Sequence, residues 1–468
     1  MSVPRSGAEL ERWLKRRRWA RAAIVYVLML LFSILFLGPL LFAALSSLKV
    51  DPLEYPPTVA IPQLSPANWA AAARQGRAGA GDMWWGGFAP GASVPFEVTY
   101  FVPDGTERGE PVFTVPRRRP GGGLGAVLVI DYAADHASVS PPTLVSEAAG
   151  THPAGPEPVG GHFVTYAVRI TFDGEGPEVS RLPLDVEAPN RQHRYVSSTL
   201  PITRLERLGL VASYNNVAPG VLGFTFNNYR RVFDEARSIT TGRSLFASWT
   251  VNSFIIAFAK VASTVLFASM AGYALARIRF PGAGLVFMLV LFAQMIPGQV
   301  IFISNYLVLR DGIFGLSRLW GQPTLLNSIT GVILSGLVGA GSVFIMKQFF
   351  ESVPREVEEA AMIDGAGQWN RFMRVVLPMA RPAIGAVTIL TFQGTWNEFF
   401  WPLVVLTTPE DIKTLPIGLL TFRNVYAGAG DWGLILAGAV LSALPIIILF
   451  VVFQRYFLEG VSYGGSKE

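Results

Sequence analysis

The sequence contains no cysteine. This absence excludes disulfide bonds, metal–thiolate sites and thiol nucleophiles, so any domain outside a membrane has to be held together by its hydrophobic core alone. Charged residues are also scarce, at 15% of the chain. Histidine occurs only four times, with spacings that fit no usual metal-ligand pattern, at His136, His152, His162 and His193. We therefore interpret the histidines as scattered surface residues.

Apolar residues are abundant, at 51% of the chain, and the mean hydropathy is +0.40. A composition this apolar is typical of membrane proteins rather than of soluble ones. A helix needs roughly 20 apolar residues to cross about 30 Å of hydrocarbon. Six segments reach this length and are predicted to span the membrane: 22–45, 247–276, 284–309, 325–346, 383–406 and 433–453. The first run is too long for the apolar core of a cleaved signal peptide, which is the less favoured alternative.

The distribution of basic residues predicts the orientation, because short cytoplasmic segments carry an excess of Lys and Arg. One set of segments carries Arg12, Lys15, Arg16, Arg17, Arg18, Arg21, Arg277, Arg279, Arg355, Arg371, Arg374, Arg381 and Arg455. The other set carries only Arg310, Arg318, Lys413 and Arg423. Both termini are therefore expected in the cytoplasm. The net charge of +5 is largely this orientation signal and gives no support to nucleic-acid binding.

The segment between the first two predicted spans differs in composition from the rest of the chain. It is rich in Gly and Pro and contains short alternating apolar runs such as FEVTYFV and FVTYAVRITF. Such runs, bounded by turn residues, predict antiparallel strands, and we expect a small β-sandwich or barrel over about 94–200. The stretches 71–80 and 148–161 are predicted to be mobile connectors.

These features predict a domain organisation in five parts. They are a basic cytoplasmic N-terminus at 1–21, a first transmembrane helix at 22–48, an extracytoplasmic region at 49–245 with a β-rich insert at about 71–222, a core of five transmembrane helices at 246–456, and a cytoplasmic tail at 457–468.

A polar segment, 351–378, lies between two long apolar stretches and must face water. Pro354 suits a first helical turn, Glu356 and Glu358 favour the positive end of a helix dipole, and Gly365 can adopt the conformation that ends a helix. Two short helices joined by a turn are expected. In the second, one apolar face is formed by Trp369, Phe372, Met373 and Val376. The residues alone leave two interpretations open: a docking site for a soluble protein, or an amphipathic elbow on the membrane surface.

Two charged residues fall inside predicted spans, where insertion costs about 2.5–3.5 kcal/mol and marks a functional position. Lys260 lies in the second span and Glu398 in the fifth. We hypothesise that they line or gate a pathway and act as a pair. The alternative is snorkelling of Lys260 and an independent, water-facing Glu398. Trp396 and Asn397 offer an aromatic face and an amide, which are the groups that a sugar requires.

The polar segment resembles the EAA loop of ATP-binding-cassette importer permeases, in particular the MalG type. The matching residues are Glu359, Ala360, Ala361, Asp364, Gly365, Leu377 and Pro378. Similar stretches are WNEFFWPLVVL, TLPIGL and WGLILAGAVLSALPIIILFVVFQRYFLEG, and the resemblance covers about 227–460 and the first span. It leaves only the external insert unmatched.

The resemblance implies an all-α polytopic fold of six transmembrane helices, MetI/MalG-like, with a β-rich domain inserted between helices 1 and 2. It implies half of a translocation pathway for a sugar, in the inner membrane of a bacterium or archaeon. The segment 351–378 would be a coupling helix seated in a cytoplasmic ATPase dimer, which carries the ATP and Mg²⁺. A second, MalF-like permease and an extracytoplasmic solute-binding protein would complete the assembly.

The chain is not expected to be an enzyme or to bind a cofactor, since no G-x-x-x-x-G-K-[ST] loop occurs in it. One alternative class remains open. A membrane receptor would use the β-rich domain to sense a ligand and the polar segment to signal to a cytoplasmic protein.

Overall fold

The structure is a computed structural model. It describes residues 7–49, 61–79, 82–115, 128–129, 136–152, 158–175, 178–179, 182–200, 204–205, 211–234, 236–238, 240–426 and 431–462. The chain divides into two compact units. Unit 1 comprises Met1–Pro116, Tyr132–Arg230 and Asp431–Val440, and unit 2 comprises Arg117–Asp131, Arg231–Gly430 and Leu441–Glu468.

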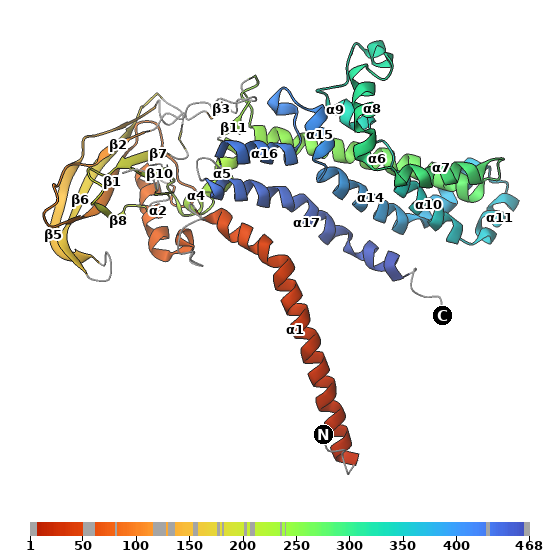
Figure 1. Cartoon of the computed structure of the whole chain (residues 1–468), viewed down its shortest axis with the longest axis horizontal. Coiled ribbons are helices and arrows are strands. Elements are labelled where there is room, and N and C mark those ends of the chain that lie inside the picture. Colours follow the sequence, from red (N-terminus) through yellow and green to blue (C-terminus); the bar gives the residue numbers. More distant parts are fainter. Residues whose placement is uncertain are drawn as a thin grey trace. The chain divides into compact units, whose positions relative to one another are not determined.

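Unit 1 combines a long first helix with a β-rich region (Figure 1). Its helices are α1 (Gly7–Leu48), α2 (Pro66–Gly79), α4 (Val221–Thr225) and the first half of α5 (Asn227–Asp234). Its strands are β1 (Ser93–Pro103), β2 (Val112–Thr114), β4 (Ala137–Val139), β5 (Thr143–His152), β6 (Val159–Phe172), β7 (Leu182–Glu187), β8 (Arg194–Ser198), β9 (Arg204–Leu205) and β10 (Val211–Val217).

The strands form two antiparallel sheets. The first has the order β4-β6-β1-β8, with β5 also paired to β6, and the second has the order β2-β7-β10-β9. Strands β1 and β6 pair along their whole length, from Ser93 opposite Thr171 to Pro103 opposite Gly161. The alternation that predicted β1 therefore sends Val94, Phe96 and Val98 to one face of the sheet.

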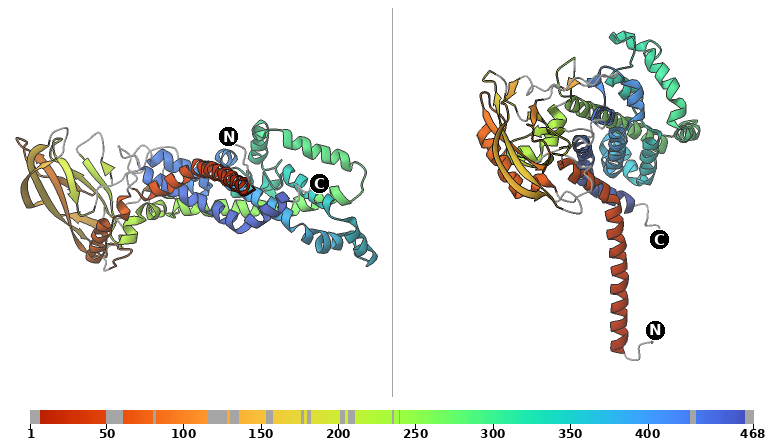
Figure 2. Two further views of the ribbon diagram at one scale, coloured as in Figure 1. Left: turned by 90° about the horizontal axis from the view of Figure 1, so that it is seen from below. Right: turned by 60° about the vertical axis from the view of Figure 1, so that its left-hand side comes forward.

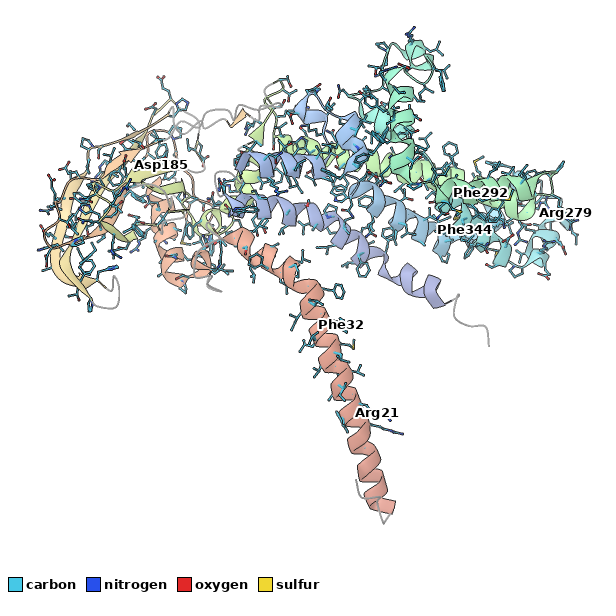
Figure 3. All side chains as sticks on the ribbon, viewed as in Figure 1. Arg21, Phe32, Asp185, Arg279, Phe292 and Phe344 are labelled. Carbon is cyan, nitrogen blue, oxygen red and sulfur yellow. The ribbon has the colours of Figure 1, made fainter. Side chains whose placement is uncertain are left out.

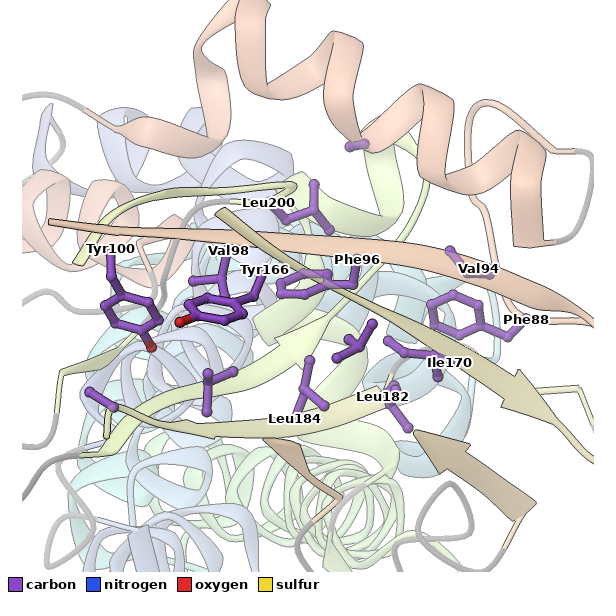
Figure 4. Packing of buried hydrophobic residues seen from close by; sticks show 14 of the residues in the cluster. Phe88, Val94, Phe96, Val98, Tyr100, Tyr166, Ile170, Leu182, Leu184 and Leu200 are labelled. Carbon is purple, nitrogen blue, oxygen red and sulfur yellow. The ribbon is translucent and has the colours of Figure 1, made fainter. Parts of the chain in front are cut away.

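The two sheets enclose one hydrophobic core, shown in Figure 4. Phe96, Val98 and Ile170 of the first sheet pack there with Leu182 and Leu184 of β7. Packing the inner faces of two sheets removes apolar side chains from water, which stabilises the region without any disulfide. The prediction of a β-rich region after the first helix is confirmed.

Both predicted connectors are wrong. Residues 71–79 belong to α2, because the run Ala70–Ala73 has high helix propensity and the helix continues through Gly76. Residues 148–152 extend β5 and residues 159–161 extend β6, and the two strands pair out to His152 opposite Val159. Gly150, Gly160 and Gly161 therefore lie in paired strands rather than in a linker, and residues 80 and 153–157 of the predicted connectors lie outside the described residues.

Side chains from α5 hold the end of α1. Asn228 Nδ2 donates hydrogen bonds to the carbonyl oxygens of Ser47 and Lys49, both at 2.8 Å. The hydroxyl groups of Ser47 and Tyr229 lie 2.7 Å apart. These bonds satisfy carbonyl groups that the end of a helix leaves without partners.

Unit 2 is helical. Its helices are α6 (Leu245–Arg277), α7 (Ala283–Met295), α8 (Gly298–Arg310), α9 (Ile329–Leu334), α10 (Ala340–Ser352), α11 (Arg355–Ile363), α12 (Gln368–Asn370), α13 (Leu377–Met379), α14 (Arg381–Trp396), α15 (Phe400–Val405), α16 (Leu415–Tyr426) and most of α17 (Trp432–Ser462). Short strands β3 (Leu128–Val129) and β11 (Ala236–Arg237) pair with each other.

Helix α6 is the centre of unit 2, with α10 and α14 packed against it (Figures 1 and 2). One core cluster joins Ala268 and Tyr273 of α6 to Met346 and Phe350 of α10. The packing is close because Gly272 has no side chain: a Cβ there would lie 2.8 Å from both Lys347 N and Met346 Cβ.

The predicted spans are interrupted more often than the sequence indicated. Within the described residues, three helices are long and apolar enough to cross a membrane: Arg18–Leu48, Leu245–Arg277 and Trp432–Phe453. Two further bent pairs raise the number to five if each pair is one span: α7 with α8, bent by 100°, and Gln368–Met379 with α14, bent by 76°. The predicted span 325–346 is divided between α9 and α10.

The bend between α7 and α8 has a local cause at Pro297. Proline has no N–H to continue the helix and disfavours the helical conformation of the preceding residue. Ile296 accordingly has an extended backbone with ψ 118°, and α8 begins directly after the proline.

Candidate functional site

The first half of the polar segment is the nine-residue helix α11. Pro354 is its N-cap, and Glu356 and Glu358 occupy the first turn, where carboxylates interact favourably with the helix dipole. Glu359 and Ala360 are exposed and Ala361 is half-buried.

Gly365 ends α11 in the predicted way. Its φ is 80°, a left-handed conformation that glycine adopts without strain. The amide of Ala366 donates to the carbonyl of Ala361 at 2.9 Å, and that of Gly365 donates to Met362 at 3.0 Å. These two bonds make a Schellman motif, with the exposed Asp364 as the C-cap. The prediction of two short helices joined by a turn is confirmed.

The second half of the segment runs from Gln368 to Met379 and contains a π-helical turn at Arg371–Val376. The wider turn lies directly before Leu377 and Pro378, where Pro378 has no N–H for the carbonyl of Arg374. Leu377 is half-buried and Pro378 is exposed.

The predicted apolar face of this half divides into two parts. Phe372 and Val376 are buried in the core of unit 2, where the ring of Phe372 lies 4.9 Å from that of Tyr273. Trp369 and Met373 remain exposed. The buried pair anchors the segment to the transmembrane helices, and the exposed pair is available to a partner.

The exposed surface of the segment is apolar at its turn. Ile363 is 85% exposed, and Met362 and Trp369 are more than half exposed. We define these three residues with Glu359 and Ala360 as the loop surface. Large apolar residues gathered on an anchored, exposed turn are typical of a site that another surface covers.

The predicted residue Lys260 lies on α6, beside the segment that separates α9 from α10. The carbonyl of Leu337, within this segment, accepts hydrogen bonds from Ser263 Oγ at 2.7 Å and Thr264 Oγ1 at 3.2 Å. Lys260 lies one helical turn away, and a Cβ on Gly336 would be 3.1 Å from its Nζ. A cationic side chain therefore meets non-helical backbone inside a predicted span.

Asn397 and Glu398 lie at another interruption, between α14 and α15. Asn397 is the exposed C-cap of α14, and the half-buried Glu398 follows it. Glu398 Oε1 accepts from the backbone N–H of Trp401 at 3.3 Å, while Trp401 Nε1 donates to Ser335 Oγ at 2.6 Å. Lys260 and Glu398 are both described, and they do not form an ion pair in this structure.

Trp396 has a different position from the predicted one. Its side chain is 2% exposed, and its ring lies 4.7 Å from that of Phe254 and 5.6 Å from that of Phe392. Its Nε1 donates to the carbonyl of Ser442 at 3.0 Å. The ring is buried and its polar edge is hydrogen-bonded, so a sugar cannot stack on it in this structure.

Sequence reasoning missed Ser263 and Thr264. The available signal was the pair Gly336 and Gly339 inside an apolar run, which weakens a helix there and frees backbone groups that need partners in a membrane. Among the described residues, no group of three His, Asp or Glu side chains could hold a metal ion.

These elements define a multi-pass membrane protein with one anchored polar loop and a polar site between interrupted helices. The family described as binding-protein-dependent transport system inner membrane component matches residues 264–463. The arabinooligosaccharides transport system permease protein AraQ of Halalkalibacterium halodurans is 36% identical over 272 residues, covering 58% of this chain and 88% of that protein. The maltodextrin transport system permease protein MdxG of Bacillus subtilis is 31% identical over 246 residues, covering 52% and 81%.

A solved bacterial ABC transporter, involved in the import of the acidic polysaccharide alginate, contains a chain 25% identical to this one, with a TM-score of 0.42 over 51% of this chain and 82% of that chain. The family follows from the match to AraQ, which is 36% identical and is covered over 88% of its length. The chain belongs to the binding-protein-dependent transport system inner membrane components. It is a multi-pass transport component rather than an enzyme, it has no cofactor of its own to bind, and the receptor hypothesis is set aside.

Proposed function

We propose that this permease forms half of the translocation pathway of an ATP-driven importer for an oligosaccharide. The similarity to permeases named for arabinooligosaccharides and maltodextrin supports this class of substrate. The binding-protein-dependent family supports delivery of the sugar by an extracytoplasmic solute-binding protein.

The proposed coupling function depends on how the polar segment 351–378, the polar loop, is packed against the rest of unit 2. Phe372 and Val376 fix it to the core that contains α6 and α10, while the loop surface stays exposed. A partner that pushes on this surface therefore moves the transmembrane helices rather than the loop alone. We assign Glu359 to a charged contact with the partner and Ala360 to a low-relief surface that allows close approach. Asp364 and Gly365 form the turn, and Leu377 and Pro378 end the loop.

The partner at this surface is a dimeric cytoplasmic ATPase, which holds the ATP and Mg²⁺. A second, MalF-like permease completes the pathway. In this arrangement the polar loop and both termini lie in the cytoplasm, as the arginine distribution predicts. Six spans are then counted, with α9 and α10 together forming the fourth.

The mechanism follows from this arrangement. A loaded binding protein docks outside, ATP binding closes the ATPase dimer, and the closing dimer moves the two coupling loops together. The spans then change from inward-open to outward-open, and hydrolysis in the ATPase resets them. The role of this chain is mechanical, because it transmits a displacement from the loop to helices that pack against α6.

Lys260, Asn397 and Glu398 are assigned to the pathway. They lie at interruptions of helices, where free backbone groups and charged side chains provide polar partners within hydrocarbon. An oligosaccharide carries many hydroxyl groups and needs such partners as it passes. We assign Trp396 to positioning of this site, since its ring is packed against Phe254 and Phe392.

A pull-down from mild detergent tests the coupling assignment. Tagged wild type is expected to recover an ATPase, whereas the double variant Glu359→Lys, Gly365→Pro recovers little, because the charge contact is reversed and the turn cannot form. The control variant Arg318→Glu reverses an exposed charge in the loop after α8 and should recover as much as wild type. Recovery of the same amount of ATPase by wild type and by both folded variants would refute the assignment.

A further inference from the structure

A basic cavity lies at the turn between α6 and α7. Its volume is about 500 Å³. It is lined by Leu275, Ala276, Arg277, Ile278, Arg279, Phe280, Pro281, Ala283 and Arg355. All of these residues belong to unit 2, and Arg279 marks the place in Figure 3.

Three arginines line this cavity, and no Asp or Glu is among its lining residues. Arg279 and Arg355 are exposed, and neither forms an ion pair with any described residue. Arg277 donates through Nη2 to the carbonyls of Phe350, at 2.5 Å, and Val353. Its Nε is buried and has no acceptor among the described residues. The cavity thus carries positive charge on Arg279 and Arg355 that no described carboxylate pairs with.

The rest of the wall is apolar. Leu275, Ile278, Phe280 and Pro281 contribute hydrocarbon surface beside the arginines. The cavity also lies at the C-terminal end of the apolar helix α6, where a span leaves the membrane. A ligand there meets cationic groups on one side and hydrocarbon on the other.

We propose that this cavity binds the phosphate headgroup of an anionic phospholipid. Basic cavities at the ends of spans recognise such headgroups, with arginine suited to phosphate through paired N–H donors. A free inorganic anion would satisfy the arginines but would leave the apolar wall exposed to water. A phospholipid satisfies both, because its acyl chains continue into the bilayer along α6 and α7.

The site connects the membrane to the polar loop. Arg355 is the first residue of α11, whereas Arg277 ends α6. A lipid phosphate held between them would fix the start of α11 relative to the α6–α7 turn. This consequence rests on the coupling function proposed above, but the binding of the lipid does not.

Native mass spectrometry of the purified permease tests the binding. The protein is released from nanodiscs of phosphatidylglycerol and phosphatidylcholine, without its ATPase, so the result is independent of coupling. Wild type should retain phosphatidylglycerol in preference to phosphatidylcholine. The double variant Arg279→Gln, Arg355→Gln should retain at least about tenfold less phosphatidylglycerol than wild type, because two of the charges that attract the headgroup are removed.

The matched control is Arg381→Gln, which removes an exposed arginine at the start of α14, outside the cavity. It should retain the lipid as wild type does. Equal retention by the double variant, or equal loss by Arg381→Gln, would overturn the proposal. Displacement of the lipid by millimolar inorganic phosphate would also overturn it and identify a site for a soluble anion. Unchanged unfolding temperatures verify that all variants are folded.

Discussion

Individual residues set how closely the helices of unit 2 approach one another. Gly272 lies at the contact of α6 with α10, and Gly418 lies against the ring of the fully buried Trp249. At both positions a methyl group would overlap atoms of the neighbour. Glycine is therefore required for packing there, at the cost of a weaker helix.

The variant Gly272→Ala should lower stability by about 1–3 kcal/mol, because its Cβ would lie 2.8 Å from the backbone nitrogen of Lys347. Gly284→Ala is the matched control, since a Cβ there meets nothing within 4 Å. This control should be neutral or slightly stabilising, as alanine favours helix. Thermal unfolding in detergent measures both. An unfolding temperature of Gly272→Ala equal to that of wild type would contradict the packing.

The interpretation of the histidines as surface residues is wrong for His193, which is 8% exposed and gives unit 1 a pH dependence. Burial lowers its pKa, although the hydrogen bond between Nε2 and the carbonyl of Glu107, at 3.0 Å, partly opposes the shift. As pH falls, the unfolded chain takes up the proton first, near its value of about 6.5. This contribution to stability is therefore complete above pH 6.5 and is lost as pH falls through the lower folded-state pKa.

When the pH is lowered from 7.5 to 5.5, the unfolding temperature should decrease more in wild type than in His193→Gln. Glutamine retains a donor for Glu107 but does not titrate. Differential scanning calorimetry of the full chain measures the two differences. The same decrease in both proteins would show that His193 is not the group responsible.

At the scale of elements, interruptions of helices place the polar groups of unit 2. The sequence predicted the apolar runs and the turn at Gly365, because both depend on local patterns. It did not predict the interruption between α9 and α10, since that depends on the hydroxyl groups of Ser263 and Thr264 on a distant helix. The burial of Trp396 also depends on remote residues and could not be predicted from its neighbours.

A double-mutant cycle tests whether Lys260 and Glu398 act in one site. Lys260→Met and Glu398→Gln should each slow transport. The change in the activation free energy of transport in the double variant should differ from the sum of the two single changes by about 0.5–3 kcal/mol, as for groups that share partners. Lys347→Met with Glu351→Gln is a control cycle on an ion pair of 2.7 Å on α10, whose side chains are 11% and 43% exposed. Additive effects on transport in the first cycle would refute a shared site.

At the scale of the whole molecule, the permease carries a β-rich region outside residues 264–463. We infer that it contacts the binding protein or the second permease. Unit 1 presents two exposed tryptophans, Trp84 and Trp85, whose backbone N–H groups donate to the carboxylate of Asp82 at 2.8 and 3.2 Å. Arg230 lies 5.9 Å from the ring of Trp85. Exposed and fixed aromatic rings are typical of binding hot spots.

If the binding protein docks on these rings, Trp84→Ser should weaken its affinity for the assembled importer by at least about tenfold, in the range of a hot-spot residue. Val112→Ser is the control, because Val112 is similarly exposed on β2. Surface plasmon resonance with the reconstituted complex compares the two. Wild-type affinity in both variants would exclude Trp84 from the docking surface.

The central claim is that the loop surface contacts an ATPase, and the absence of cysteine makes a direct test simple. Within this chain, a photoreactive maleimide reacts only at an introduced cysteine, so the tagged permease is labelled at one position and purified before illumination products are compared. Ile363→Cys places the probe on the loop surface, and Leu319→Cys places it on a side chain of equal exposure, 83% against 85%, in the loop after α8. After illumination of membranes, mass spectrometry identifies the captured proteins. We predict a protein with a G-x-x-x-x-G-K-[ST] loop at position 363 and none at 319. Its absence at 363 in the folded permease would contradict the account.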